Sequence, residues 1–124
     1  MAEHPLILVA DDEYFLRLRS RDTLSEAGYR VLTAVDGKDC VEQYRMAGPE
    51  AVSLVILDYI MPGMDGTETF FELRKLNPAV RVLVHSASIE PEKLKALIAA
   101  GALGSIPKPT TRENFLALVE AALR

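Results

Sequence analysis

Short apolar runs alternate with longer amphipathic stretches along the whole chain. The apolar runs cover residues 6–9, 30–35, 54–57 and 82–84, and a briefer run ends at Ile106. The runs have the length and β-branched content of strands, whereas the stretches between them repeat apolar residues at helical spacing. Strands that alternate with helices are typical of α/β units around a parallel sheet. The pattern therefore predicts five such units.

Positions at helical spacing mark the faces of the helices that would cover the sheet. They are Phe15, Leu18, Thr23, Leu24 and Ala27; Cys40, Val41, Tyr44 and Arg45; Phe70, Leu73 and Leu76; Leu94, Leu97 and Ile98; and Phe115, Leu118, Val119 and Ala122. Helix ends are expected at glycine or proline, namely at Gly28, Gly48-Pro49, Asn77-Pro78 and Gly101. The fourth strand would then begin at Val80. The last helix would begin at Thr110 or Thr111, since Thr110 and Glu113 have capping-box spacing.

Polar residues that could bind a ligand or take part in a reaction lie where these strands end. Asp11 and Asp12 follow the first strand, Asp58 closes the third, Ser86 follows the fourth and Lys108 follows the fifth. The carboxyl ends of parallel strands lie at one edge of a sheet, so these side chains are expected to share one crevice. Three neighbouring carboxylates repel one another and favour a divalent cation. With a lysine and a hydroxyl added, the crevice could handle phosphate.

The composition and charge of the chain argue against several classes of protein function. The 124 residues are 49% hydrophobic and 26% charged, as in a globular domain, and the net charge of −4 argues against direct nucleic-acid binding. The apolar runs are shorter than the ~18 residues of a membrane span. No basic region precedes the first apolar run, so no signal peptide is expected. Cys40 is the only cysteine, which fits a reducing, cytoplasmic location.

Four motifs resemble those of the receiver domain of two-component response regulators. They are Asp11-Asp12, Asp58 with the following loop 61–66 (Met-Pro-Gly-Met-Asp-Gly), Ser86-Ala87 and Lys108-Pro109, in the order and spacing of that family. The resemblance implies a flavodoxin-like, doubly wound fold, with a five-stranded parallel sheet of order 2-1-3-4-5 and helices on both faces. It also implies a single receiver domain over residues 1–124, without an output domain.

The resemblance assigns Asp58 as the phosphate acceptor. A carboxylate that attacks a phosphoryl group meets like charge, so cations are needed beside it. By the resemblance, this chain would bind Mg²⁺ directly through Asp12 and Asp58, and through water from Asp11. The backbone carbonyl of Ile60 would be a further ligand.

The same resemblance assigns the groups that would hold the phosphoryl oxygens. Lys108 would pair with Asp58 at rest and with the phosphoryl group afterwards, and Ser86 would donate its hydroxyl. The backbone amides of Tyr59 and Ala87 would serve the other oxygens. In the family the peptide bond after the lysine is cis. The protein would then be no enzyme in the ordinary sense, but a phosphoacceptor that assists its own phosphorylation and dephosphorylation.

Signalling would pass through protein contacts. The resemblance implies a histidine kinase or phosphotransfer protein as donor, and a downstream partner on the face formed by the fourth helix, fifth strand and fifth helix. The oligomeric state would be a monomer or a phosphorylation-dependent dimer. The family's switch couples the hydroxyl at Ser86 to an aromatic residue three positions before the lysine, where this chain has Ser105. We therefore expect phosphorylation to alter residues 88–94 more than the strand at Ser105.

Two other classes of function remain open from the sequence. One is a receiver-shaped binding module that works without phosphate, which Ser105 mildly favours. The other is an enzyme, either a flavodoxin-like cofactor protein or an aspartyl phosphatase; the latter would need an acid where Ile60 stands. His85 is expected to pack rather than react, because it points away from Ser86. Met61 and Met64 are expected to pack in their loop.

Overall fold

The computed structural model describes residues 4–124, and ten elements alternate along them. In chain order they are β1 (Leu6–Ala10), α1 (Tyr14–Glu26), β2 (Arg30–Ala34), α2 (Gly37–Ala47), β3 (Leu54–Asp58), α3 (Gly66–Leu76), β4 (Val82–Ser86), α4 (Pro91–Ala99), β5 (Gly104–Pro107) and α5 (Arg112–Leu123). The predicted alternation of strands and helices is confirmed. Residues 1–3, part of the segment in which no signal peptide is expected, lie outside the described residues.

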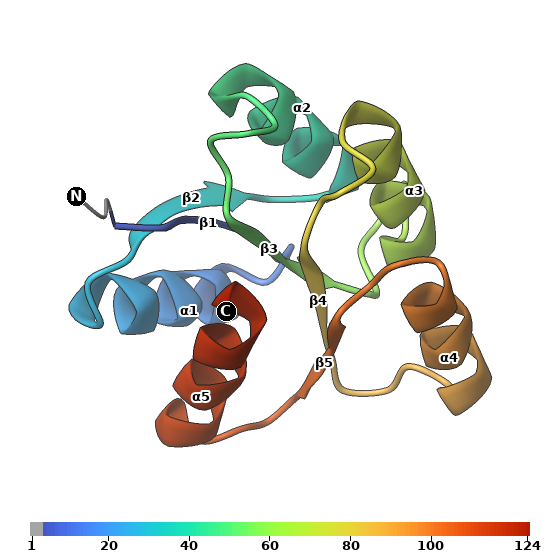
Figure 1. Ribbon diagram of the computed structural model, residues 1–124. Coiled ribbons are helices and arrows are strands. Elements are labelled where there is room, and N and C mark those ends of the chain that lie inside the picture. The colour runs from blue at the N-terminus through green and yellow to red at the C-terminus, as the bar shows by residue number, and fades with distance from the viewer. Residues whose placement is uncertain (1–3) are drawn as a thin grey trace.

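The five strands form one parallel sheet of order β2-β1-β3-β4-β5, which confirms the flavodoxin-like prediction. Figure 1 shows α1 and α5 on one face of the sheet and α2, α3 and α4 on the other. The central strands β3 and β4 are buried along their full length, because helices cover both of their faces. Strands of this kind read as continuous apolar runs. No helix in residues 4–124 is long and apolar enough to cross a membrane.

Each face of the sheet has its own core, because successive strand residues point to opposite sides. Toward α2, α3 and α4 the buried side chains include Leu8, Val55, Leu57 and Val84, packed with Tyr44, Phe70, Leu73 and Leu97. Toward α1 and α5 they include Ile7, Val9, Ile56, Leu83 and Ile106, packed with Leu24, Phe115 and Val119. His85 lies on the α1–α5 side, where its ring is 5.7 Å from that of Phe115. The expectation that His85 packs is thus confirmed.

The predicted faces of three helices are partly wrong. In α2, Arg45 is exposed and pairs with Glu42 at the surface, so it does not belong to the face toward the sheet. Phe15 is 78% exposed and Ala27 is exposed, whereas Ser20 and Leu24 are the buried residues of α1. The first turn of α1 lies at the carboxyl edge of the sheet, so Phe15 has no strand beneath it and contacts Tyr14 instead. Ile98 is 45% exposed, since the nine-residue α4 covers the sheet near its edge and buries only Leu97 fully.

Two expected strand boundaries also move. The second strand, β2, ends at Ala34, one residue before the expected Val35. The fourth strand, β4, begins at Val82 and not at Val80, because the backbone N–H of Val80 donates to the carbonyl of Asn77 in a turn. The expected capping box at the last helix does not form. Thr111 caps α5 by accepting a hydrogen bond from the backbone N–H of Asn114.

A capping box is present instead at the start of α3, where it fixes the loop after β3. Asp65 accepts from the backbone N–H of Glu68, and the Glu68 carboxylate reaches back to Asp65. The next residue, Gly66, lies against the backbone of Tyr59, and a Cβ there would be 2.7 Å from the Tyr59 Cα. A glycine is therefore required where α3 begins, directly beside the end of β3.

Candidate functional site

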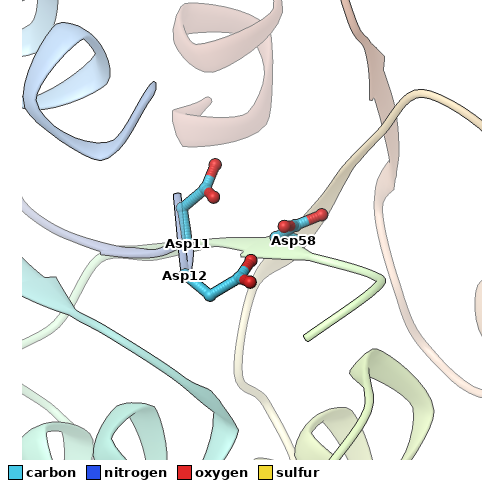
Figure 2. Close-up of side chains that lie close together, drawn as sticks. All are labelled: Asp11, Asp12 and Asp58. Atoms are coloured by element: carbon cyan, nitrogen blue, oxygen red, sulfur yellow. The ribbon is translucent and has the colours of Figure 1, made fainter. Parts of the chain in front are cut away.

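The carboxyl edge of the sheet brings together the polar residues that the strand pattern placed there. Asp58 ends β3, Ser86 ends β4, and Lys108 follows β5. Asp11 and Asp12 follow β1, and Figure 2 shows their carboxylates gathered with that of Asp58. These elements open into a crevice of about 590 Å³.

The three carboxylates are close enough to share one cation. Asp11, Asp12 and Asp58 each offer an oxygen atom, and these atoms lie within 4.8 Å of one another. Asp11 is buried, Asp58 is only 8% exposed, and Asp12 is exposed to the crevice. Hard oxygen ligands of this kind suit Mg²⁺. The donor set therefore fits the expected metal.

The raised pKa of Asp58 also supports a cation site at this edge of the sheet. Burial raises the pKa of Asp58 from 3.8 to about 6, and the neighbouring Asp11 and Asp12 carboxylates add to the rise. The Lys108 ammonium and the backbone N–H of Ile60 act in the opposite direction without cancelling it. The protein alone therefore leaves negative charge at this edge incompletely compensated, as a cation site requires.

Lys108 lies between two of the carboxylates. Its Nζ is 2.9 Å from Asp11 Oδ2, with which it forms a hydrogen bond, and 3.5 Å from Asp58 Oδ1. The expected pairing with Asp58 is thus present as an ion pair, but the shorter contact is to Asp11. The peptide bond between Lys108 and Pro109 is cis, as expected. The other oxygen of Asp11 accepts from the backbone N–H of Glu13 at 2.9 Å, which holds that carboxylate in place.

The loop after β4 supplies hydrogen-bonding groups on the opposite wall. The Ser86 hydroxyl oxygen accepts from the backbone N–H of Ser88 at 3.2 Å, which orients the side chain while its proton stays available to a ligand. Ser86, Ala87 and Ser88 all line the crevice together with Lys108. The backbone N–H of Lys108 also donates to the Ser86 carbonyl, so the two walls are joined.

The remaining predicted residues lie at or outside the rim. Ile60 lines the crevice with an exposed apolar side chain. Tyr59 points away, toward the start of α3, where its hydroxyl accepts from Thr67 at 3.3 Å. Ser105 lies within β5 opposite Val84 and does not line the crevice. The structure thus gathers the predicted acids, the serine and the lysine, and leaves Ser105 apart from them.

The crevice is also lined by residues that the sequence analysis did not assign to a site. It continues between α1 and α5, where Leu16, Ser20, Thr23, His85 and Phe115 line it. Three residues of this wall, Leu16, Ser20 and Thr23, recur at helical spacing along α1. The only sign of this wall in the sequence is that polar residues occupy part of the α1 stripe that faces inward. That sign does not show that residues of β4 and α5 complete the wall.

Comparisons with known proteins agree on one family. The family model for the response regulator receiver domain matches residues 7–120. The chemotaxis protein CheY of Treponema pallidum is 34% identical over 119 residues, which cover 95% of this chain and 82% of that protein. CheY of Thermotoga maritima is 34% identical over 104 residues, 83% of this chain and 84% of the other. The response regulator MprA of Mycolicibacterium vanbaalenii is 36% identical over 95% of this chain but only 50% of its own length.

Solved structures give the same result. The chemotaxis protein CheY4 of Vibrio cholerae has a TM-score of 0.89 and 29% identity, with 98% of this chain and all of that chain covered. CheY in a CheX–CheY–BeF3–Mg²⁺ complex from Borrelia burgdorferi has a TM-score of 0.91 and 26% identity, with 97% of this chain and 90% of that chain covered.

Proposed function

The chain belongs to the family of response regulator receiver domains, and we propose that it accepts a phosphoryl group on Asp58 from a histidine kinase or phosphotransfer protein. One observation carries the proposal. The Asp58 carboxylate ends a buried strand with Lys108 Nζ at 3.5 Å and two further carboxylates within 4.8 Å. A nucleophile, its counter-charge and a set of metal ligands are thereby present within one crevice. Family membership also makes this a signalling receiver rather than an ordinary enzyme.

In the proposed reaction an oxygen of Asp58 attacks the phosphorus atom. The new bond is an acyl phosphate, and the bond between phosphorus and the donor group breaks as the donor leaves with its electron pair. Lys108 would neutralise one phosphoryl oxygen, and the free proton of Ser86 would bond to another. The backbone amides of Tyr59 and Ala87 would serve the third. With a pKa of about 6, Asp58 is ionised and nucleophilic at neutral pH.

Magnesium would be held by the acidic cluster. We assign Asp12 and Asp58 as direct ligands, Asp11 as a ligand through water, and the carbonyl of Ile60 as a further ligand. When bound, Mg²⁺ supplies the positive charge that offsets the phosphoryl oxygens and the three carboxylates. The presence of Mg²⁺ and BeF3 in the Borrelia complex supports this assignment.

The output is proposed to be a protein contact on the α4–β5–α5 face, by a monomer or a phosphorylation-dependent dimer. Ile98 of α4 and Leu103 before β5 are exposed apolar residues in this region, which suits a docking surface. The CheX partner in the Borrelia complex supports a protein partner for this chain as well. A single domain over residues 1–124, a cytoplasmic location and self-assisted dephosphorylation stay predictions.

The alternative is a binding module that acts without phosphate, and Ser105 is the residue that favours it. An aromatic residue is missing there, so no ring rotation is available to relay the switch to the outer surface. The acids, Ser86 and Lys108 are nevertheless all in place around Asp58, and a module without phosphoryl chemistry has no need of that set.

Incubation with acetyl phosphate and Mg²⁺ tests the two candidates. We expect the intact mass to rise by one phosphoryl group, and Asp58→Asn to abolish the rise. Asp22→Asn, an exposed aspartate of α1, is the matched control and should label like the wild type. A modification found on Asp11 or Asp12 would contradict the assignment of the acceptor. A wild-type protein that gains no mass with any small phosphodonor would favour the phosphate-independent module.

A further inference from the structure

Part of the crevice is lined by residues that the phosphoryl chemistry does not use. We call this part the side pocket, and it is lined by Leu16, Ser20, Thr23, His85 and Phe115. It lies between α1 and α5, which run side by side on the same face of the sheet (Figure 1). An ion pair at 3.0 Å between Arg112 of α5 and Glu26 of α1 ties these helices together. The volume of about 590 Å³ for the crevice as a whole lies within the range of small-molecule sites, roughly 300–1,000 Å³.

Two nearly buried polar side chains line this pocket without a protein partner. His85 and Ser20 are each only 6% exposed, and the side chain of neither forms a hydrogen bond with any residue among 4–124. Every side-chain nitrogen or oxygen that is completely buried in the described chain does have a partner. The imidazole nitrogens and the serine hydroxyl must therefore border the pocket space. Buried polar groups of this kind are satisfied by water or by a ligand.

The walls of the side pocket suit an aromatic guest. Leu16 and Phe115 provide apolar surface, and Ser20, Thr23 and His85 provide polar atoms. The Phe115 ring lies 5.7 Å from the His85 ring and is inclined to it at 53°. The hydroxyl of Ser20 can donate and accept, and the imidazole has two ring nitrogens that take part in hydrogen bonds. The charged residues that line the rest of the crevice are Asp12, Glu13, Arg19, Asp58, Lys108 and Arg112.

We propose that the side pocket binds a small, planar heteroaromatic molecule. Its ring would lie against Phe115, and its N–H and acceptor atoms would bond to the His85 imidazole and the Ser20 hydroxyl. The site needs neither Mg²⁺ nor a phosphoryl group. Because Ser86 and Lys108 line the same crevice, an occupant would stand next to the phosphoryl site.

7-Azaindole, a planar bicyclic molecule with one N–H donor and one ring-nitrogen acceptor, is a suitable probe, and 1-methyl-7-azaindole is its matched control without the N–H. Titration of the ¹⁵N-labelled protein, without Mg²⁺ or phosphodonor, should give saturable amide shifts centred on Ser20, His85 and Phe115. Loss of one hydrogen bond should weaken 1-methyl-7-azaindole about fivefold relative to 7-azaindole. Because the titration omits phosphorylation, its result is independent of the proposed acceptor role.

Variants of the chain assign the contacts. His85→Phe and Ser20→Ala should each weaken 7-azaindole about fivefold, because each removes one of its two hydrogen bonds, and Ser20→Leu, which fills the pocket, should abolish binding. Ser53→Ala, at the opposite end of the sheet, should bind 7-azaindole like the wild type. The ¹⁵N spectrum of each variant reports whether it is folded, and Ser20→Ala serves if His85→Phe is not. The proposal is overturned if wild type shows no saturable shifts, if the shifts centre on Tyr14 and Phe15, or if methylation and the variants change nothing.

Discussion

The charge on Asp58 should destabilise the metal-free protein, and its removal should therefore stabilise the fold. The pKa of Asp58 rises from 3.8 to about 6 on folding, chiefly through burial. Between these values the folded state binds more protons than the unfolded state, so stability falls as pH rises through this window. The penalty is absent well below pH 3.8 and complete above pH 6. Asp58→Asn keeps the shape of the side chain and removes the charge.

The size of the effect follows from the same shift. A tenfold change in proton affinity is worth about 1.36 kcal/mol, so the rise in pKa corresponds to at most about 3 kcal/mol. The crevice opens to solvent, which lowers this, and we expect Asp58→Asn to gain about 1–3 kcal/mol at pH 7.5. For a chain of this length that gain raises the melting temperature by about 4–12 °C. At pH 4.5 the linkage relation leaves about a third of the gain.

Thermal unfolding followed by circular dichroism, in the presence of a chelator at pH 4.5 and 7.5, measures the difference. Asp22→Asn is the control, because its carboxylate is exposed and pairs only with Arg21 at the surface; its effect should stay within about 0.5 kcal/mol at both pH values. If Asp58→Asn melts no higher than wild type at pH 7.5, the charge of Asp58 is already compensated in the metal-free fold. An equal gain at both pH values would show that charge is not the cause.

Three further outcomes are expected. Mg²⁺ at millimolar concentration should raise the melting temperature of wild type, and Asp12→Ala should lose most of that shift, as calorimetry with increasing metal will show. Lys108→Ala should keep this metal response but lower the rate of phosphorylation by acetyl phosphate by on the order of tenfold or more, measured by intact mass. Hydrogen exchange with and without beryllofluoride should change at residues 88–94 more than at residues 104–106; the reverse pattern would mean that the relay through β5 operates despite Ser105.

The order of elements was predictable because it depends on local pattern, whereas the buried faces were not fully predictable. Strand runs are short and apolar, and Gly28 and Gly101 end their helices at positive φ angles that favour glycine. A helical stripe shows which side of a helix is apolar, but not how far the sheet extends beneath it. Phe15 and Ile98 were misplaced for this reason, since one overhangs the edge of the sheet and the other lies near its margin.

The acidic cluster was predictable from topology alone, and the side pocket was not. Asp11 and Asp58 end adjacent parallel strands, so their proximity follows once the strand order is known. The side pocket depends on three elements distant in the sequence, with Ser20, His85 and Phe115 each contributing one wall. No spacing in the chain encodes that meeting, because it is fixed by how α1 and α5 pack against the sheet.

The pairing of Lys108 with Asp58 was predicted, but its shorter contact with Asp11 was not, and that contact has a consequence for the proposed reaction. A lysine has a long flexible stem, so sequence identifies the strand end from which it reaches but not the oxygen that it selects. Here its hydrogen bond goes to the buried Asp11, while Asp58 receives a longer contact at 3.5 Å. A carboxylate that is firmly bonded to an ammonium is a poorer nucleophile, because its lone pairs are engaged. In the proposed reaction, Asp11 would therefore hold the counter-charge within reach of the incoming phosphoryl oxygens and leave Asp58 with the weaker contact to Lys108.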